Sequence, residues 1–97
     1  NIIGDIDKIL ENRVRLGVMS ILMVNEEMDF NALKEMLELT DGNLASHLNT
    51  LEKKEYIKVT KQFVGKKPKT TYEATELGKI SFKNHINALE KIIKGQG

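Results

Sequence analysis

The segment from Thr40 to Lys54, TDGNLASHLNTLEKK, limits the possible folds more than any other part of the chain. Leu44, Leu48 and Leu51 recur at i, i+4 and i+7, the spacing of a buried stripe on a helix. The other face is polar and nearly uncharged, whereas a solvent-facing helix usually pairs Glu with Lys. Its side chains belong to types that bond to base edges or to phosphates, and they are Asn43, Ser46, His47, Thr50 and Lys54. Taken alone, the segment fits a DNA recognition helix and an ordinary surface helix equally well.

The preceding sequence repeats the helical spacing of apolar residues. It predicts a short amphipathic helix over residues 2–10, a largely buried helix after an Asn12 cap, and a third helix over residues 31–39. Met28-Asp29-Phe30 alternates apolar and polar residues and predicts a very short strand. Thr40 is the expected N-cap of the next helix. Two short helices joined so tightly predict a helix-turn-helix over about 31–54.

After Lys54 the apolar spacing changes from helical to alternating. Residues 56–64 and 70–74 predict two strands, because β-branched and aromatic residues alternate there with polar ones. Gly65 to Lys69 predicts the turn between them, since no helix tolerates that sequence. We therefore expect a β-hairpin with a basic tip at about 56–74.

Thr75 is the expected N-cap of a last helix over about 76–94. The apolar side of that helix is predicted to carry Leu77, Ile80, Phe82, Ile86, Leu89 and Ile93. With 97 residues, the chain is long enough for one core. The predicted fold class is mainly α with a small β-hairpin (α+β), in a single domain over residues 1–97.

Composition narrows the class of protein further. No cysteine is present, which excludes disulfides, cysteine-bound zinc and thiol catalysis and permits a cytoplasmic setting. No catalytic triad, carboxylate pair, phosphate-binding loop or metal-ligand spacing can be assembled. We therefore expect no enzyme, no cofactor and no metal. No apolar run approaches the roughly 20 residues that span a bilayer, and no signal peptide opens the chain, so a cytoplasmic protein without membrane contact is expected.

Two residue types that often bind ligands have simpler explanations here. His85 is the only histidine on the last helix, and Glu90 is the only acid late in that helix. A structural or interface role is therefore expected for His85 rather than metal binding. The methionines have core spacing and are expected to fill the core, and they are Met19, Met23, Met28 and Met36.

Charge is distributed unevenly, although the net charge is only +1. Residues 1–39 carry four basic and eight acidic side chains, whereas residues 40–72 carry seven lysines and three acids. A basic middle beside an acidic front is expected when one face meets a polyanion. Candidate phosphate contacts are Lys61, Lys66, Lys67 and Lys69 of the hairpin, with Arg13 and Arg15 as further candidates. Two alternatives stay open: the lysines make a solvated, aggregation-resistant hairpin, and His47 bonds within the protein.

Three segments together resemble winged-helix transcriptional regulators of the MarR and ArsR type, above all a small stand-alone subgroup from archaea and bacteria. They are NRVRLGVMSIL (residues 12–22), FNALKEMLELTDGNLASHLNTLEKKEYIKV (30–59) and FVGKKPKTTYEATELGK (63–79). The specific features are L-T-x-G-N-L-x-x-H-L-x-x-L-E, then Y-I, then the wing G-K-K-P-K-T-T-Y and T-x-x-G, in this order and spacing. The resemblance covers nearly the whole chain and implies a winged helix-turn-helix.

The resemblance also implies contacts to double-stranded DNA. Recognition-helix contacts are implied for Asn43, Ser46, His47 and Thr50, and wing contacts for Lys66, Lys67 and Lys69. Wings of this family often carry arginine, but this wing has only lysine, which holds a phosphate without reading guanine through two bonds.

The first and last helices are implied to pair across a two-fold axis, which places two recognition helices one DNA turn apart, roughly 34 Å. The implied dimer interface comprises Ile2, Ile6, Ile9, Phe82, Ile86, Leu89 and Ile93. The sequence thus predicts a homodimeric repressor that binds an inverted-repeat operator, with any small-molecule effector unknown and confined to the dimer interface. The alternative is a winged-helix module that binds other proteins, which predicts aromatic or aliphatic anchors on the face over residues 43–54, where the sequence has none.

Overall fold

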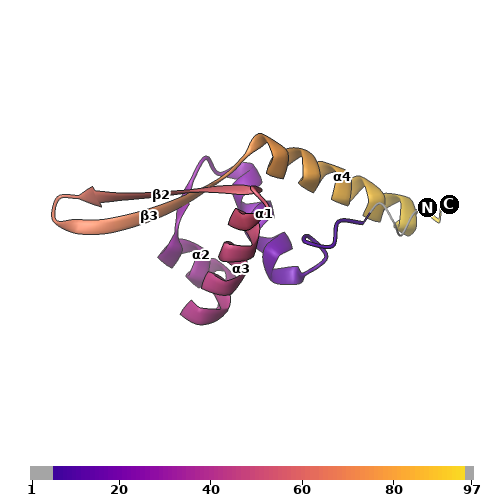
Figure 1. Ribbon diagram of the computed structural model, residues 1–97. Coiled ribbons are helices and arrows are strands. Elements are labelled where there is room, and N and C mark those ends of the chain that lie inside the picture. Colours follow the sequence, from indigo (N-terminus) through magenta and orange to yellow (C-terminus); the bar gives the residue numbers. More distant parts are fainter. Residues whose placement is uncertain (1–5, 96–97) are drawn as a thin grey trace.

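The computed structural model describes residues 6–95, so the predicted interface residue Ile2 lies outside the described part of the chain. Within that part, four helices and three strands form an α+β winged helix, which confirms the predicted fold class. The hairpin and the last helix extend from opposite ends of a central helical body (Figure 1), and the molecule measures 55 × 25 × 21 Å. In chain order the elements are α1 (Arg13–Val24), β1 (Met28–Asp29), α2 (Phe30–Leu37), α3 (Asp41–Lys53), β2 (Ile57–Val64), β3 (Lys67–Ala74) and α4 (Glu76–Ile93).

Capping side chains decide where the helices begin. Asn12 accepts from two backbone amides at the start of α1, and Thr75 accepts from one at the start of α4, as predicted. The Asp29 side chain accepts from the backbone amide of Ala32 and caps α2. This helix therefore begins at Phe30, one residue before the predicted start at Asn31. Each cap satisfies amides that have no acceptor inside their own helix.

One hydrophobic core joins the helices to the sheet. The predicted leucine stripe of α3 is buried. Residues from the turn before α1, from α1, from α2 and from the sheet complete this core, and they are Leu10, Val18, Met19, Leu22, Leu33, Ile57 and Tyr72. Met36, predicted as core filler, is instead 57% exposed on α2, and Val24 at the end of α1 is 81% exposed. A helical stripe tells which residues share a face, but not how far neighbouring elements cover that face.

The predicted opening helix is wrong for the residues that the structure describes. Residues 8–11 form a turn that follows Asp7, whose carbonyl oxygen accepts from the amides of Leu10 and Glu11. The side-chain Oδ1 of Asp7 accepts from the amide of Ile9 at 2.8 Å and from that of Leu10 at 3.4 Å. An aspartate that bonds the backbone just after it competes with helix formation. The resulting turn buries Leu10 completely.

The wing is a tighter hairpin than predicted. β2 and β3 pair along their whole lengths, so the turn contains only Gly65 and Lys66 rather than five residues. Gly65 has a φ of 67°, which glycine adopts at little cost and which suits a two-residue hairpin turn. The sheet order is β1-β3-β2, and β1 pairs with β3 only at Thr71 and Tyr72. The outer half of β3 is therefore an edge, where Pro68 is tolerated.

α4 approaches the body through Gly78. This residue is buried, and a Cβ there would collide with the carbonyl oxygen of Tyr56, so only glycine permits the contact. The contact turns Gly78 and His85 toward the core. The apolar side predicted for α4 is therefore only partly correct, because Leu77 and Ile80 are 49% and 54% exposed.

The predicted dimer residues have different environments. Ile9 and Phe82 are half-buried against the core of their own chain, whereas Ile93 is 82% exposed near the end of α4. Half-buried as well are Ile6, Ile86 and Leu89. Because Ile92 is also 42% exposed, the outer end of α4 presents aliphatic surface.

Candidate nucleic-acid interface

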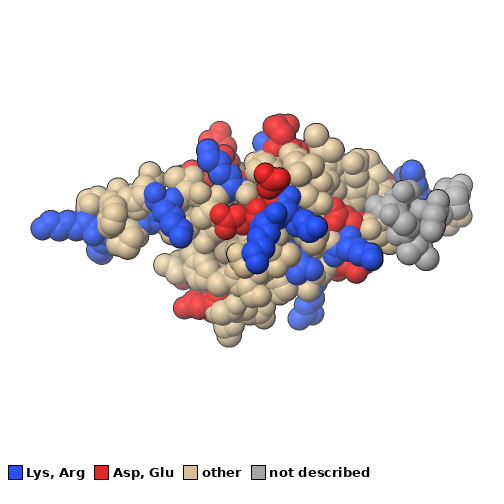
Figure 2. Space-filling view, in the orientation of Figure 1, with Lys and Arg blue, Asp and Glu red and all other residues tan. Residues whose placement is uncertain are grey.

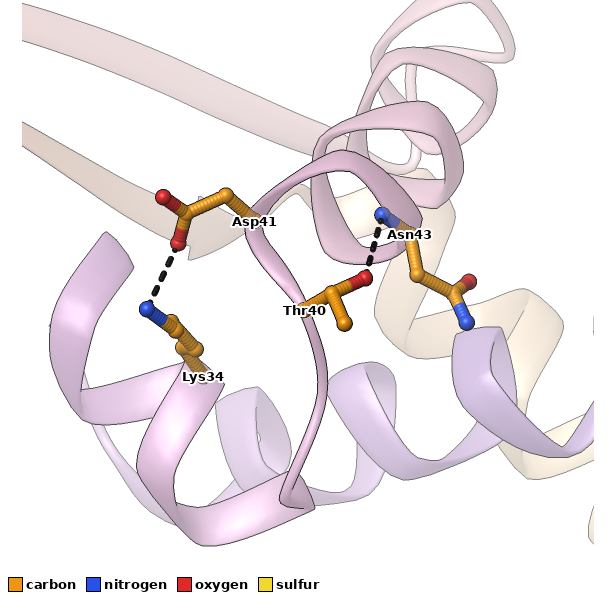
Figure 3. Close-up of polar contacts among 4 residues, drawn as sticks. All are labelled: Lys34, Thr40, Asp41 and Asn43. Carbon is orange, nitrogen blue, oxygen red and sulfur yellow. Dashed lines mark hydrogen bonds and ion pairs between the residues drawn. The ribbon is translucent and has the colours of Figure 1, made fainter.

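The turn between α2 and α3 is held by backbone and side chains together (Figure 3). After α2, Glu38 adopts a left-handed backbone with a φ of 53°, which reverses the chain. Nζ of Lys34 lies 2.8 Å from Oδ1 of Asp41, and this ion pair ties α2 to the first turn of α3. Thr40 Oγ1 accepts from the backbone amide of Asn43 at 3.2 Å, which confirms the predicted cap. The ion pair thus bridges the two helices, and the cap begins α3 directly after the turn.

α3 presents the polar face predicted for a recognition helix. Asn43 and Ser46 are exposed, and the Asn43 amide points away from the ion pair between α2 and α3 (Figure 3). Thr50 is half-buried, and its hydroxyl donates to the carbonyl oxygen of Ser46 at 3.3 Å. Lys54 is exposed at the C-cap. Apart from Ala45, every exposed side chain of α3 is polar.

His47 is half-buried on this face, and its ring bonds within the protein. Nδ1 lies 3.0 Å from a terminal guanidinium nitrogen of Arg15 on α1. A guanidinium only donates, because it stays protonated, so Nδ1 accepts and the neutral ring carries its proton on Nε2. Burial, followed by the positive charge of Arg15, lowers the pKa of His47. The ring is therefore neutral at pH 7.

The two arginines predicted as DNA backbone contacts differ. Nε of Arg15 donates to the carbonyl oxygen of Ile9 at 2.7 Å, so this guanidinium joins the N-terminal turn to His47. Arg13 is exposed and lines a surface hollow of about 440 Å³ between α1, the end of α2 and α3. Asn43 and His47 line the same hollow. Arg13 thus lies beside the polar face of α3, whereas the side chain of Arg15 is hydrogen-bonded within the protein.

The wing displays lysines at its tip and on both faces. In the β2–β3 ladder Lys61 lies on one face, whereas Lys58, Lys67 and Lys69 lie on the other. Lys66 occupies the turn, and all five are exposed. Figure 2 shows basic side chains at the free end of the hairpin and along it, with acidic ones nearer the body. Lys58 was missed as a candidate, although its place in the alternating strand contained the signal.

The outer wing is free of acid and partly apolar. From Ile57 to Tyr72 the sequence has five lysines and no Asp or Glu. Phe63 and Val64 near the tip are 74% and 58% exposed. A hollow of about 420 Å³ separates this part of the wing from the start of α2, and Lys67 and Lys69 line it. The wing therefore offers a cationic edge with exposed apolar side chains close to its basic tip.

A polar cluster that sequence reasoning missed connects three distant segments. The Tyr56 hydroxyl donates to Oδ2 of Asp7 at 2.6 Å, and the Asp7 amide donates to Nδ1 of His85 at 3.1 Å. Burial, followed by the bond to Asp7, raises the pKa of Tyr56. His85 is only 2% exposed, so it has a structural role. Nothing in the local sequence around Asp7 pointed to partners this far along the chain.

Other kinds of site find little support. Across residues 6–95, no group of three or more His, Cys, Asp or Glu side chains is placed to hold a metal ion. Over the same range no helix is long and apolar enough to cross a membrane. The polar face of α3, the hollow beside it and the cationic wing are the features that a function must explain.

Comparison with known proteins identifies the class. Residues 14–93 match the family model described as a winged helix DNA-binding domain, and the chain belongs to this family. The family suggests a role other than catalysis. The chain is 37% identical over 87 residues to an uncharacterised protein of Methanocaldococcus jannaschii, and the match covers 90% of this chain and 95% of that relative.

Solved structures share the fold. A transcriptional regulator homologue from Pyrococcus horikoshii matches with a TM-score of 0.84 at 36% identity, over 90% of this chain and 86% of that one. Reduced AbfR bound to DNA matches with a TM-score of 0.73 at 19% identity, over 87% of this chain and 61% of that one, a likeness of fold alone. The winged-helix resemblance is confirmed, and the matches support a DNA-binding regulator.

Proposed function

We propose that this chain is a homodimeric transcriptional repressor of the MarR/ArsR type that binds an inverted-repeat operator in the cytoplasm. The observation that carries the proposal is the pairing of α3, whose exposed side chains are polar apart from Ala45, with a wing whose residues 57–72 carry five lysines and no acid. In this combination the polar helix can contact base edges in the major groove, while the lysines of the wing contact phosphates of the DNA backbone. The DNA-bound form of AbfR, which has a similar fold, adds support.

The residues have separate roles in this proposal. Asn43, Ser46, His47 and Thr50 enter the major groove, where amide, hydroxyl and imidazole groups contact base edges. Phosphates are held by mobile ammonium groups at the end of α3 and along the wing, which are Lys54, Lys61, Lys66, Lys67 and Lys69. Arg13 adds a phosphate contact at the mouth of the hollow beside α3.

The dimer is proposed to form through the outer part of α4, beyond the body of the chain (Figure 1). Ile93 and Ile92 are 82% and 42% exposed there, and a second copy would cover both. The predicted set of Ile2, Ile6, Ile9, Phe82, Ile86, Leu89 and Ile93 remains the proposed interface, with Ile9 and Phe82 contributing less because they already pack on their own core. A two-fold axis there places the two α3 helices about one DNA turn apart.

A second candidate function is protein binding through the wing. Phe63 and Val64 are exposed near the wing tip, and exposed aromatic residues often anchor protein interfaces. We rank it second because the exposed side of α3 offers no comparable anchor.

The experiment that tests the proposal is selection from a pool of random duplex DNA at several salt concentrations, followed by sequencing. Enrichment of an inverted repeat, with affinity that falls steeply as salt rises, is the expected result. No retention at the lowest salt would overturn DNA as the ligand and favour the protein-binding candidate. Enrichment of a single half-site would overturn the dimer alone.

A further inference from the structure

The guanidinium of Arg15 donates two hydrogen bonds inside the protein, from two different nitrogens. Nε donates to the carbonyl oxygen of Ile9 at 2.7 Å, and a terminal nitrogen donates to Nδ1 of His47 at 3.0 Å. Ile9 belongs to the turn that Asp7 holds through two backbone amides. The guanidinium is planar, so two bonds from different nitrogens fix its orientation. His47 is thereby held by the Arg15 guanidinium, whose own position is fixed by its bond to Ile9.

The second ring nitrogen of His47 is left for solvent. Among the described residues no protein group bonds Nε2, and no buried polar side-chain atom there lacks a partner. Nε2 is therefore in contact with solvent rather than buried. Because Nδ1 accepts from Arg15, the neutral ring places its one N–H on Nε2. His47 thus faces outward as a hydrogen-bond donor only.

We propose that Arg15 is a positioning residue, which holds His47 so that its Nε2–H donates to an acceptor atom on a base edge. This proposal rests on the proposed function, because it assumes that α3 lies in the major groove. The acceptors there are N7 of purines, O6 of guanine and O4 of thymine. The amino groups of adenine and cytosine only donate, so His47 discriminates against a base that offers an amino group at its position.

Direct phosphate binding by Arg15 would require a different arrangement. The guanidinium would have to leave Ile9 and His47, and the carbonyl oxygen of Ile9 would lose its donor. Arg13, two residues earlier, is exposed, and its side chain makes no hydrogen bond or ion pair within the described part of the chain. Arg13 is therefore the arginine of α1 that could reach a phosphate without breaking a bond, and it is also a matched control for Arg15.

The first test uses the free protein and does not depend on DNA. Imidazole ¹⁵N NMR at about pH 7.5 distinguishes Nε2–H from Nδ1–H and reports a hydrogen bond to the unprotonated nitrogen. We expect the Nε2–H form of His47, with a hydrogen-bonded Nδ1 signature that Arg15→Met removes and Arg13→Met retains. An Nδ1–H form in the wild type overturns the proposal whether or not the protein binds DNA.

The second test measures affinity for the selected operator and for random DNA, with wild type, Arg15→Met, His47→Ala, the double variant and Arg13→Met. Removal of one hydrogen bond lowers the operator-to-random ratio about three- to tenfold. We expect this loss for Arg15→Met and for His47→Ala, and no further loss for the double variant. Arg13→Met should weaken both DNAs equally. Losses that multiply in the double variant would overturn the positioning role, because Arg15 would then act on DNA by itself.

A third measurement keeps the proposal falsifiable if Arg15→Met fails to fold. Operator duplexes in which single purines are replaced by their 7-deaza forms lack the N7 acceptor. One replacement is expected to weaken wild type about three- to tenfold and to leave His47→Ala unchanged. The comparison is repeated for replacements at guanine O6 and thymine O4. If every replacement that weakens wild type weakens His47→Ala equally, base recognition by His47 is overturned, while operator binding itself can still stand.

Discussion

The backbone amide of Asp7 donates to Nδ1 of His85 at 3.1 Å, across a separation of 78 residues in the chain. The same aspartate accepts from the hydroxyl of Tyr56, between α3 and β2, at 2.6 Å. The turn that Asp7 holds also supplies the carbonyl oxygen bound by Arg15, which in turn bonds His47. A continuous series of polar contacts therefore runs from α4, the proposed dimer element, to the proposed recognition helix.

Tyr56→Phe is expected to lower the free energy of unfolding by about 2 kcal/mol, because the half-buried Asp7 carboxylate loses a short hydrogen bond. Urea denaturation followed by circular dichroism measures the change. Tyr72→Phe is the matched control, since the Tyr72 hydroxyl makes no hydrogen bond with protein in the described range. Equal losses from both changes would contradict a specific role for the bond between Tyr56 and Asp7.

Gly78→Ala is expected to cost about 3 kcal/mol of stability or to prevent folding, because the added methyl group meets the carbonyl oxygen of Tyr56 and must push α4 away. Gly42→Ala is the control, because a Cβ at Gly42 would meet open space within a helix. That change is expected to stabilise the protein by about 0.5 kcal/mol. Thermal melting of the two variants under identical conditions makes the comparison. A tolerated Gly78→Ala would mean that α4 packs differently.

The helices and the hairpin could be predicted because their signals are local. Asn12, Thr40 and Thr75 cap helices that begin where the apolar period begins. The three leucines of α3 lie on one buried face, and they are Leu44, Leu48 and Leu51. The opening helix was wrong because a single side chain, that of Asp7, bonded the backbone instead. The spacing of apolar residues gives no sign that a side chain will compete with the helix for backbone amides.

The candidate site was predictable to a similar extent. The polar side chains of α3 could be predicted, because a helical face follows from spacing alone. The bond between Arg15 and His47 could not be, since it joins two helices across 32 residues and depends on how α1 crosses α3. For the same reason the sequence does not separate Arg13 from Arg15, two residues apart on one helix, whereas the structure leaves Arg13 exposed and bonds Arg15 within the protein.

Lys66→Ala with Lys67→Ala is expected to weaken operator and random DNA alike, because phosphate contacts carry little sequence information. The slope of log K against log salt should flatten by about one unit for each phosphate that the variant no longer neutralises. Fluorescence anisotropy titrations at four salt concentrations provide the slopes. Lys79→Ala with Lys83→Ala, two exposed lysines of α4, removes the same charge elsewhere and should leave the slope nearly unchanged. If both pairs flatten the slope equally, the effect reflects net charge and not the wing.

Discrimination between operator and random DNA is expected to fall as the pH is lowered. The folded-state pKa of His47 lies below its ordinary value, so the contribution of the neutral ring is complete above about pH 6.5 and is lost as the pH falls through the lowered pKa. Protonation puts a hydrogen on Nδ1 and opposes the bond to Arg15. Other charges that line the same hollow are Arg13 and Glu38.

Binding of both DNAs, followed from about pH 7.5 down to the lowest pH at which the protein stays folded, measures the effect. The operator-to-random ratio should fall about three- to tenfold, with tighter binding to random DNA because of the added positive charge. His47→Ala should show a nearly flat ratio over this range. A wild-type ratio that does not change with pH, or a variant that retains the same pH dependence, would assign the titration to another group.

Ile93→Glu is expected to dissociate the proposed dimer without unfolding the chain. Ile93 is 82% exposed at the outer end of α4, so its own chain loses little packing when it becomes charged, whereas a dimer interface would bury the charge at a large cost. Val24→Glu provides a matched control, because Val24 is 81% exposed at the end of α1, outside the proposed interface. Sedimentation equilibrium should give a monomer for Ile93→Glu and a dimer for Val24→Glu.

The same substitution should also change DNA binding. Because two monomers bind two half-sites independently, Ile93→Glu should lose most of its preference for an inverted repeat over a single half-site. A wild-type monomer, or a dimer that survives Ile93→Glu together with Ile92→Glu, would place the interface elsewhere.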